Sequence, residues 1–282
     1  MPEVDFCEWI GRTDESEDFI APAPLAGLAA TLDRDWEELA EEARVPPLWH
    51  WLYFLPRARA SELGQDGHPL KGGFLPPVEL PRRMWAGGRL QFHGPVNVGS
   101  RAIRRSVIQA IRNKSGRSGQ LVFVTVQHQI FSDGQLAISE EQDIVYRGAA
   151  ADGAQGATPV KAPIGAAWQR VITPDPVQLF RYSALTFNGH RIHYDEAYAK
   201  QAEGYPALVV QGPLIATLLL DLVQRHQPAT RIRSFSFKAL HPTFLHAPFT
   251  VCGEPAGDGR TIDLWAQDCH GNLTMQASAT TL

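Results

Sequence analysis

Residues 213–226 read PLIATLLLDLVQRH and form the most continuously apolar stretch of this 282-residue chain. Gly212 precedes the stretch, and Pro213 suits the first position of a helix, where the missing N–H of proline leaves no hydrogen bond unmade. Apolar residues occupy almost every side of this predicted helix, so we expect it to be buried on most sides. It is too short for a membrane-spanning helix, which needs roughly 20 apolar residues.

Short runs of alternating apolar and polar residues surround this helix, and such alternation predicts antiparallel strands. WQRVIT (168–173) precedes the helix. The runs RIRSFSFKAL, PFTVCGEP, RTIDLWAQDC and NLTMQASATTL follow it, with turn sequences at 257–259 and 270–272. One buried helix wrapped by a curved antiparallel sheet is the hot-dog unit.

The first half of the chain repeats this order. After an acidic, loop-like start, residues 24–43 carry leucines and Trp36 at helical spacing, which predicts a helix. Beyond a segment rich in Pro, Gly and Trp (46–88) come the alternating runs GRLQFHGPV, SRAIRRSVIQAI, GQLVFVTVQHQIF and QLAISEEQDIVYR, with a hairpin turn predicted at 132–134.

These patterns predict an α+β double hot-dog, in which each of two tandem units has a long helix wrapped by a curved antiparallel sheet. Two unrelated α+β domains are the alternative that the patterns leave open. The small, flexible stretch GAAADGAQGAT divides the chain. We therefore predict an N-terminal unit over 1–147, a linker over 148–160 and a C-terminal unit over 161–282.

The composition excludes several kinds of partner and location. Net charge is −4, from 26 Lys and Arg against 30 Asp and Glu, so nothing global attracts nucleic acid or an anionic membrane. Cys7, Cys252 and Cys269 form no CxxC pair, which argues against disulfides and a Cys-based zinc site. The acidic N-terminus is unlike a signal peptide. We expect a cytoplasmic protein that forms a two-fold homodimer.

The segment YSALTFNGHRIHYDEAY (182–198) carries the most distinctive chemistry of the sequence. Asp195 is a good N-cap for a short helix, so Asn188, His190 and His193 are expected on the loop before it. An imidazole exchanges protons near neutral pH, and a carboxamide both accepts and donates hydrogen bonds. A turn role for Asn188 and structural roles for the histidines are the alternatives. A metal site is not predicted, because the sequence suggests no third ligand nearby.

Residues 181–214 resemble the active segment of the MaoC-like hydratases and dehydratases. They most resemble the branch of hydroxyacyl-thioester dehydratase type 2 and mesaconyl-CoA (3-methylfumaryl-CoA) hydratase. The stretches 46–54, 67–92 and 114–130 resemble the N-terminal dehydratase-like domain of that branch. The resemblance implies the hot-dog fold and reversible addition of water across the 2,3 double bond of an acyl thioester, with no metal or redox cofactor.

The family motif, roughly G-D-x-N-P-[ILV]-H, implies the roles of individual residues. Its catalytic His corresponds to His193, and its catalytic Asp corresponds to Asn188, so the carboxylate of the wider family is absent here. His190 and Arg191 stand at its Asn and Pro positions. We expect the Gly212 N–H, at the start of the apolar helix, to stabilise the thioester oxygen. The first half has no counterpart of FNGHRIHYD, so we expect one active site per chain.

The substrate implied is an acyl-CoA. The residues predicted to bind it are Arg191, His190, Pro213, Lys238 and Arg233. Further basic candidates for the CoA phosphates are Arg101, Arg104, Arg105, Lys114, Arg117 and Arg231. The aromatic run Trp49, His50, Trp51 and Tyr53 is a candidate wall for an acyl pocket, and Arg191 or His50 is a candidate partner for a second substrate carboxylate. No spacing recommends His68, His128, His241 or His246.

Three alternative functions stay open from the sequence. One is a 3-hydroxyacyl-carrier dehydratase of fatty-acid synthesis, which differs in carrier and chain length. Another is a hot-dog thioesterase, which directs water at the carbonyl carbon instead. The last is a non-catalytic acyl-CoA binding module.

Overall fold

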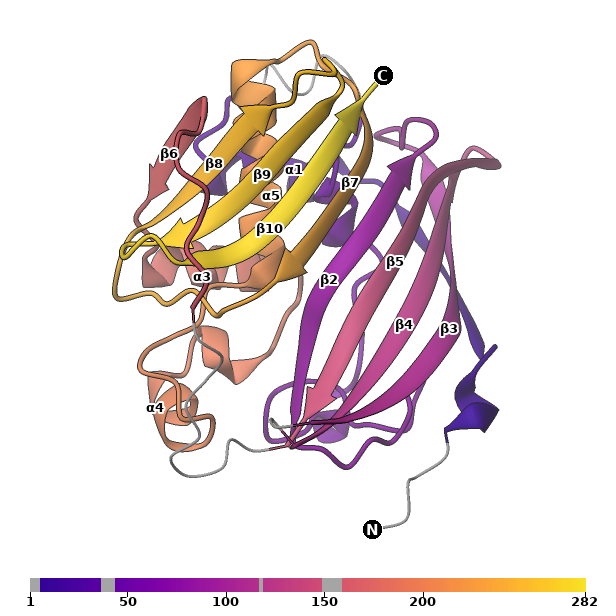
Figure 1. Cartoon of the computed structure of the whole chain (residues 1–282). Helices are drawn as coiled ribbons and strands as arrows, with labels where there is room; N and C mark the ends of the chain where they lie inside the picture. Colours follow the sequence, from indigo (N-terminus) through magenta and orange to yellow (C-terminus); the bar gives the residue numbers. More distant parts are fainter. Residues whose placement is uncertain (1–5, 37–43, 117–118, 149–158) are drawn as a thin grey trace.

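The computed structural model describes residues 6–36, 44–116, 119–148 and 159–282, and its main feature is one ten-stranded antiparallel sheet (Figure 1). The strands are ordered β1-β3-β4-β5-β2-β7-β10-β9-β8-β6. The first five along the chain are β1 (Thr13–Phe19), β2 (Arg82–Phe92), β3 (Arg101–Gly116), β4 (Gly119–Ser132) and β5 (Gln135–Arg147). The second five are β6 (Trp168–Ile172), β7 (Ile232–Ala239), β8 (Phe249–Pro255), β9 (Thr261–Asp268) and β10 (Leu273–Thr281).

The two halves of the sheet meet where β2 pairs with β7, and we call this contact the seam. Pairing runs from Gly87 opposite Lys238 to Gln91 opposite Ser234. A side chain at Gly87 would place its Cβ only 2.7 Å from the Phe237 carbonyl oxygen, so glycine permits this close approach. The seam joins two five-stranded sheets into the double hot-dog predicted from the sequence.

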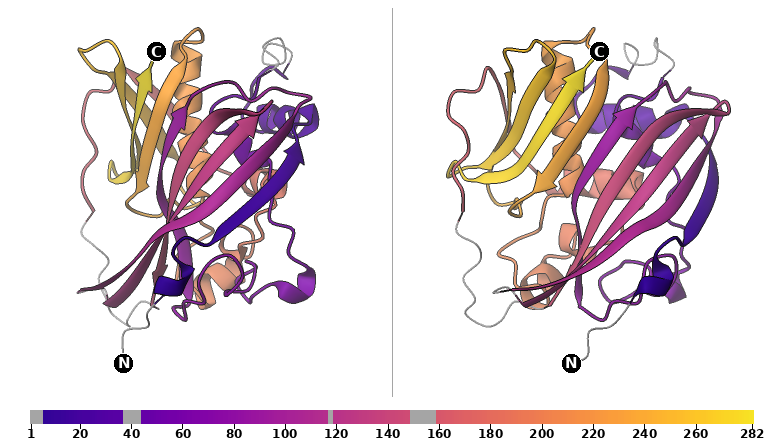
Figure 2. Two further views of the ribbon diagram at one scale, coloured as in Figure 1. Left: turned by 90° about the vertical axis from the view of Figure 1, so that its right-hand side faces the viewer. Right: turned by 45° about the vertical axis from the view of Figure 1, so that its right-hand side comes forward.

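Four helices belong to the described part of the chain: α1 (Pro22–Thr31), α3 (Pro176–Leu185), α4 (Glu196–Gln201) and α5 (Gly212–His226). Helices α1, α3 and α5 lie on one side of the sheet (Figures 1 and 2). Every residue of α5 from Leu214 to Val223 is buried, as its all-round apolar sequence predicts. None of the helices in the described ranges is long and apolar enough to cross a membrane.

The prediction of a helix over 24–43 is only partly right. Helix α1 begins at Pro22 and ends at Thr31. Asp33 then adopts a left-handed conformation with φ 54°, which is incompatible with a continuous right-handed helix. Residues 37–43 lie outside the described residues. The helix predicted after Asp195 is confirmed, and α3 begins in the same way after Asp175, since both side chains accept hydrogen bonds from backbone N–H groups of the first turn.

The acidic start of the chain is a strand and not the loop expected. Strand β1, TDESEDF, pairs with β3 at the edge of the sheet. Its exposed acidic side chains face arginines of β3, in the pairs Glu17 with Arg101 and Glu15 with Arg105. Acidic residues are rare in strands, so pattern alone points away from this strand. Opposite charges across the strand pair supply the missing stabilisation, directly opposite for Glu15 with Arg105 and diagonally for Glu17 with Arg101.

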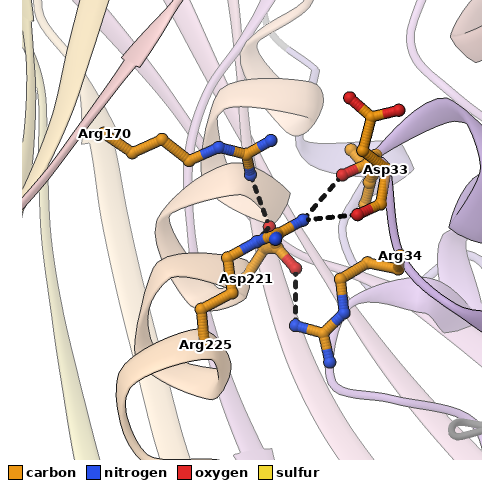
Figure 3. A network of polar contacts seen from close by, with 6 residues as sticks. Asp33, Arg34, Arg170, Asp221 and Arg225 are labelled. Carbon is orange, nitrogen blue, oxygen red and sulfur yellow. Dashed lines mark hydrogen bonds and ion pairs between the residues drawn. The ribbon is translucent and has the colours of Figure 1, made fainter.

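A buried carboxylate on α5 connects elements from both halves (Figure 3). Asp221 is 2% exposed and pairs with Arg34 at 3.2 Å, Arg170 at 2.8 Å and Arg225 at 2.7 Å. Arg225 also donates to the backbone oxygens of Leu32 and Asp33, just after α1. The cluster therefore fixes the one acidic residue of the apolar helix against the N-terminal half.

Candidate active site

A cavity of about 1480 Å³ draws its walls from both halves of the chain. Asn188, His190, His193, Gly212 and Pro213 all line it, together with Lys238 near the seam. The predicted loop and the start of the predicted helix thus share one cavity. The N-terminal half contributes several polar side chains to the same cavity, among them His50, His68, Arg83, Arg104 and Glu140.

His193 is held so that one ring nitrogen stays available. It ends the short 3₁₀ helix Arg191–His193 and is 7% exposed. Its Nδ1 lies 2.7 Å from the Val209 carbonyl oxygen, and the Val209 N–H donates to the Ile192 oxygen at 3.0 Å. A carbonyl only accepts, so Nδ1 carries the proton and Nε2 keeps its lone pair. Burial lowers the pKa of His193 to about 4, which keeps the imidazole neutral and able to take a proton at pH 7.

Asn188 lies on the turn that leaves α3. Its backbone N–H donates to the Ser183 oxygen at 2.8 Å, and its side-chain Oδ1 accepts from the His190 N–H at 3.1 Å. The side chain thus orders the loop that presents His190 and His193. Its amide NH₂ group is available to a ligand in the cavity.

Helix α5 begins at the cavity wall. Gln211, the residue before it, is buried and donates to the Leu179 oxygen at 2.9 Å and the Ser183 Oγ at 3.0 Å, which fixes where the helix starts. No side chain caps the first turn. The first N–H groups of a helix have no intrahelical acceptor, so this end of α5 can receive developing negative charge.

Two of the predicted substrate-binding residues do not line the cavity. The Arg191 guanidinium pairs with Asp195 at 2.7 Å, donates to the Gln65 oxygen at 3.0 Å and lies over the Tyr198 ring. Arg233 is exposed on β7 and outside the lining. Of the other basic candidates, Arg104 lines the cavity, whereas Arg101 and Arg105 form the ion pairs with β1.

The aromatic run is divided between core and cavity. Trp49 is buried in the core, whereas His50, Trp51 and Tyr53 line the cavity. Buried Glu140 accepts hydrogen bonds from Trp51 at 2.9 Å and lies 3.1 Å from the His50 Nε2. Burial raises the pKa of Glu140, but the hydrogen bond and charge of His50 outweigh it and lower the pKa to about 2. The Nε2 of His50 is therefore committed to Glu140, whereas its Nδ1 has no hydrogen-bond partner among the described residues.

Sequence reasoning missed Asp66 and His68. The loop that carries them packs on the loop of Asn188 and His193, where the Arg191 N–H donates to the backbone oxygen of Asp66 at 2.9 Å. The His68 and His190 ring centroids are 4.2 Å apart, and those of His190 and His193 are 5.4 Å apart. Ligand-type atoms of Asp66, His68 and His190 all lie within 4.8 Å of one another. The one signal for Asp66 and His68 in the sequence is that they stand two residues apart, a spacing that can bring a carboxylate beside an imidazole.

The contact between the two loops depends on glycine, so we expect Gly67→Ala to impair catalysis. Gly67 has φ +85°, and a Cβ there would lie 1.9 Å from the Gly189 oxygen. Alanine must push the loops apart, and a misplacement of about 1 Å costs about 10²-fold in rate. Gly72→Ala is the matched control, because Gly72 has φ +92° but its nearest Cβ contact would be 3.6 Å away. Equal kcat values for the two variants would contradict this role of the loop contact.

A buried helix under a double antiparallel sheet, with an Asn/His loop at the helix N-terminus, defines the class of double hot-dog acyl-thioester hydratases and dehydratases. The chain belongs to the hydroxyacyl-thioester dehydratase type 2 family, whose model matches residues 48–245. The predicted family and the predicted enzyme class, a hydro-lyase, are thereby confirmed.

Individual relatives agree. The chain is 50% identical to the mesaconyl-C(4)-CoA hydratase of Chloroflexus aurantiacus, over 99% of this chain and 98% of that protein. A MaoC-like dehydratase from Phytophthora capsici superimposes with a TM-score of 0.71 at 13% identity, covering 96% of this chain and 95% of that one. A double hot-dog protein of Mycobacterium tuberculosis superimposes with a TM-score of 0.55 at 14% identity, over 97% and 96% of the two chains. These two likenesses concern the fold alone.

Proposed function

We propose that this enzyme reversibly hydrates the 2,3 double bond of an enoyl-CoA whose acyl group carries a second carboxylate, with mesaconyl-C4-CoA as the leading substrate. The observation that carries the proposal is that Asn188, His193 and the N-terminus of α5 line one cavity. The 50% identity to a hydratase of that substrate supports the choice of acyl group.

The reaction needs a base, a group that orients water and a donor for the thioester oxygen. Asn188 holds the water, and as its oxygen bonds to C3 a proton passes to the His193 Nε2. The π electrons of the 2,3 bond move to the thioester oxygen, where the Gly212 N–H and the α5 N-terminus stabilise the enolate. C2 then receives a proton, and dehydration is the reverse.

A carboxylated acyl group needs a cation close to the reacting carbons, because in mesaconyl-C4-CoA the second carboxylate is attached to C3. Arg83 lines the cavity from β2, and its Nη2 lies 3.5 Å from the carbonyl oxygen of Pro69, the neighbour of His68. None of the ion pairs between described residues includes Arg83, whereas the adjacent Arg82 pairs with Glu203 at 2.9 Å. Arg83 is the residue we assign to the substrate carboxylate.

We expect Arg83→Gln to raise the KM for mesaconyl-C4-CoA by about 10-fold to 10²-fold, since a hydrogen bond to a charged group contributes about 1.5–3 kcal/mol. The KM for crotonyl-CoA, which has no second carboxylate, should stay within about threefold. Steady-state assays of enoyl absorbance with both substrates measure the two effects. An equal rise in KM for both substrates would show that Arg83 does not bind the second carboxylate.

A substrate panel tests the proposal as a whole. The purified protein is incubated with mesaconyl-C4-CoA, crotonyl-CoA and longer enoyl-CoA esters, and hydration is followed by loss of enoyl absorbance and the mass gain of one water. We expect the dicarboxylic ester to have the highest kcat/KM. A preference for long chains would favour the second candidate, a 3-hydroxyacyl-carrier dehydratase, which the family match supports. Release of free CoA thiol from saturated esters would instead indicate a thioesterase.

Three further parts of the proposal concern the whole chain. We propose a cytoplasmic enzyme, a homodimer, and a division into two hot-dog units over 1–147 and 161–282 joined by a linker over 148–160. Most of that linker lies outside the described residues. Light scattering of the purified protein measures the oligomeric state, and fractionation of the source cell measures location.

A further inference from the structure

The carboxylate that Asn188 lacks has a counterpart on the other half of the molecule. Asp66 and His68 lie on the loop that packs against the loop of Asn188 and His193. A backbone hydrogen bond from Arg191 to Asp66 joins the two loops. The His68 Nδ1 lies 3.0 Å from the Asp66 Oδ2, and the His68 backbone N–H donates to the Asp66 Oδ1 at 3.0 Å. These two contacts fix the imidazole on its carboxylate.

The tautomer of His68 follows from this geometry. With Asp66 ionised, Nδ1 must be the donor, so Nε2 keeps its lone pair. Burial raises the pKa of Asp66, but the hydrogen bonds from His68 and the charge of Arg83 lower it further, so the carboxyl stays ionised. Burial lowers the pKa of His68 despite Asp66, so the ring is neutral before a proton arrives.

Charge compensation distinguishes His68 from His193. A proton on His193 creates a buried cation whose Nδ1 partner is only the neutral carbonyl of Val209. A proton on His68 completes an ion pair with Asp66. An unpaired buried charge is far more costly than a paired one, so a proton taken into this cavity is most stable on His68. The His190 ring packs against the rings of both, so His68 and His193 face the same part of the cavity.

We propose that His68, oriented and charge-compensated by Asp66, is a second acid–base residue of this active site, which receives the proton lost by water and delivers it to C2. This inference rests on the proposed hydratase function. In hydration, the water oxygen bonds to C3 while its proton goes to the His193 Nε2, and the proton then moves to the His68 Nε2 across the cavity that both rings line. The enolate then takes this proton at C2, so one proton leaves water and one reaches carbon. Dehydration reverses each transfer.

The same three side chains have the composition of a cation site, and the surroundings decide between the two roles. Arg83 borders the group, and its positive charge lowers the pKa values of both His68 and His190. A nearby guanidinium also disfavours a divalent cation at that position. A proton shared with Asp66 leaves the pair neutral, so the acid–base role suits this position better.

The test compares the full-length wild type with His68→Gln and Asp66→Asn, using the best substrate of the panel. We expect His68→Gln to lower kcat by about 10²–10⁴-fold with KM within about threefold, as for loss of a general acid–base group. Asp66→Asn should lower kcat less and shift the acid limb of the kcat/KM profile to lower pH, because the imidazolium loses its counterion. The charged and titratable groups that face His68 are Asp66, Arg83, His190 and His193.

His93→Gln is the matched control, since His93 is exposed, its ring bonds to Ser139 and it lies outside the cavity lining. Circular dichroism and thermal melting verify that each variant is folded. An active wild type together with a His68→Gln variant that keeps wild-type kcat and pH profile would overturn the inference and leave the hydratase function intact. A wild type that hydrates no enoyl-CoA defeats the proposed function itself. If 1,10-phenanthroline abolishes wild-type activity and added zinc restores it, Asp66, His68 and His190 form a metal site and the acid–base role of His68 is wrong.

Discussion

Replacing His193 with alanine is expected to lower the kcat for enoyl-CoA hydration by about 10²–10⁴-fold, the contribution of a positioned acid–base group. The structural reason is that the ring of His193 is anchored through its Nδ1. Nδ1 donates to Val209, whose own N–H holds Ile192, so Nε2 has one orientation. In the described part of the loop of Asn188 and His193, no other imidazole is held by a hydrogen bond to a backbone carbonyl.

The measurement follows loss of enoyl absorbance under saturating substrate. His93→Gln again serves as the control for a change of imidazole outside the cavity. A His193→Ala variant that keeps most of the wild-type rate would remove His193 from the mechanism. Asn188→Ala supplies the companion test, because loss of its Oδ1 releases the His190 N–H and loosens the same loop.

Replacing Asp221 with alanine is expected to lower the free energy of unfolding by about 3–5 kcal/mol, the cost of removing one partner of a buried ion pair. The carboxylate is 2% exposed and compensates Arg34, Arg170 and Arg225 (Figure 3). Without it, three guanidinium groups share a partly buried site with no described carboxylate partner. Chemical denaturation followed by tryptophan fluorescence measures the change.

A surface ion pair provides the contrast. Glu196 and Lys200 form an exposed i,i+4 pair on α4, and exposed pairs contribute little to stability. We expect Glu196→Ala to leave the denaturation midpoint almost unchanged. If Asp221→Ala is no less stable than Glu196→Ala, the buried cluster does not stabilise the contact between the two halves.

Local pattern determined much of this fold. The apolar run of α5, the N-cap residue Asp195, and the hairpin at Asp133 and Gly134 depend on neighbouring residues only, so they are visible in the sequence. The loop with Asn188 and His193 is recognisable for the same reason. Strand β1 was missed because arginines of a distant strand stabilise its acidic residues.

Tertiary structure alone decided which groups meet at the site. His68 and Asp66 reach His190 because two loops pack through Gly67 and Gly189, and no periodicity encodes that contact. Arg191 lies between Asn188 and His193 in the sequence, but its guanidinium donates to the Gln65 backbone oxygen of the other loop and lies outside the cavity lining. Hydrogen bonds and periodic burial within one segment are local and can be predicted, whereas charge pairing and proton transfer depend on distances between segments that only the folded chain sets.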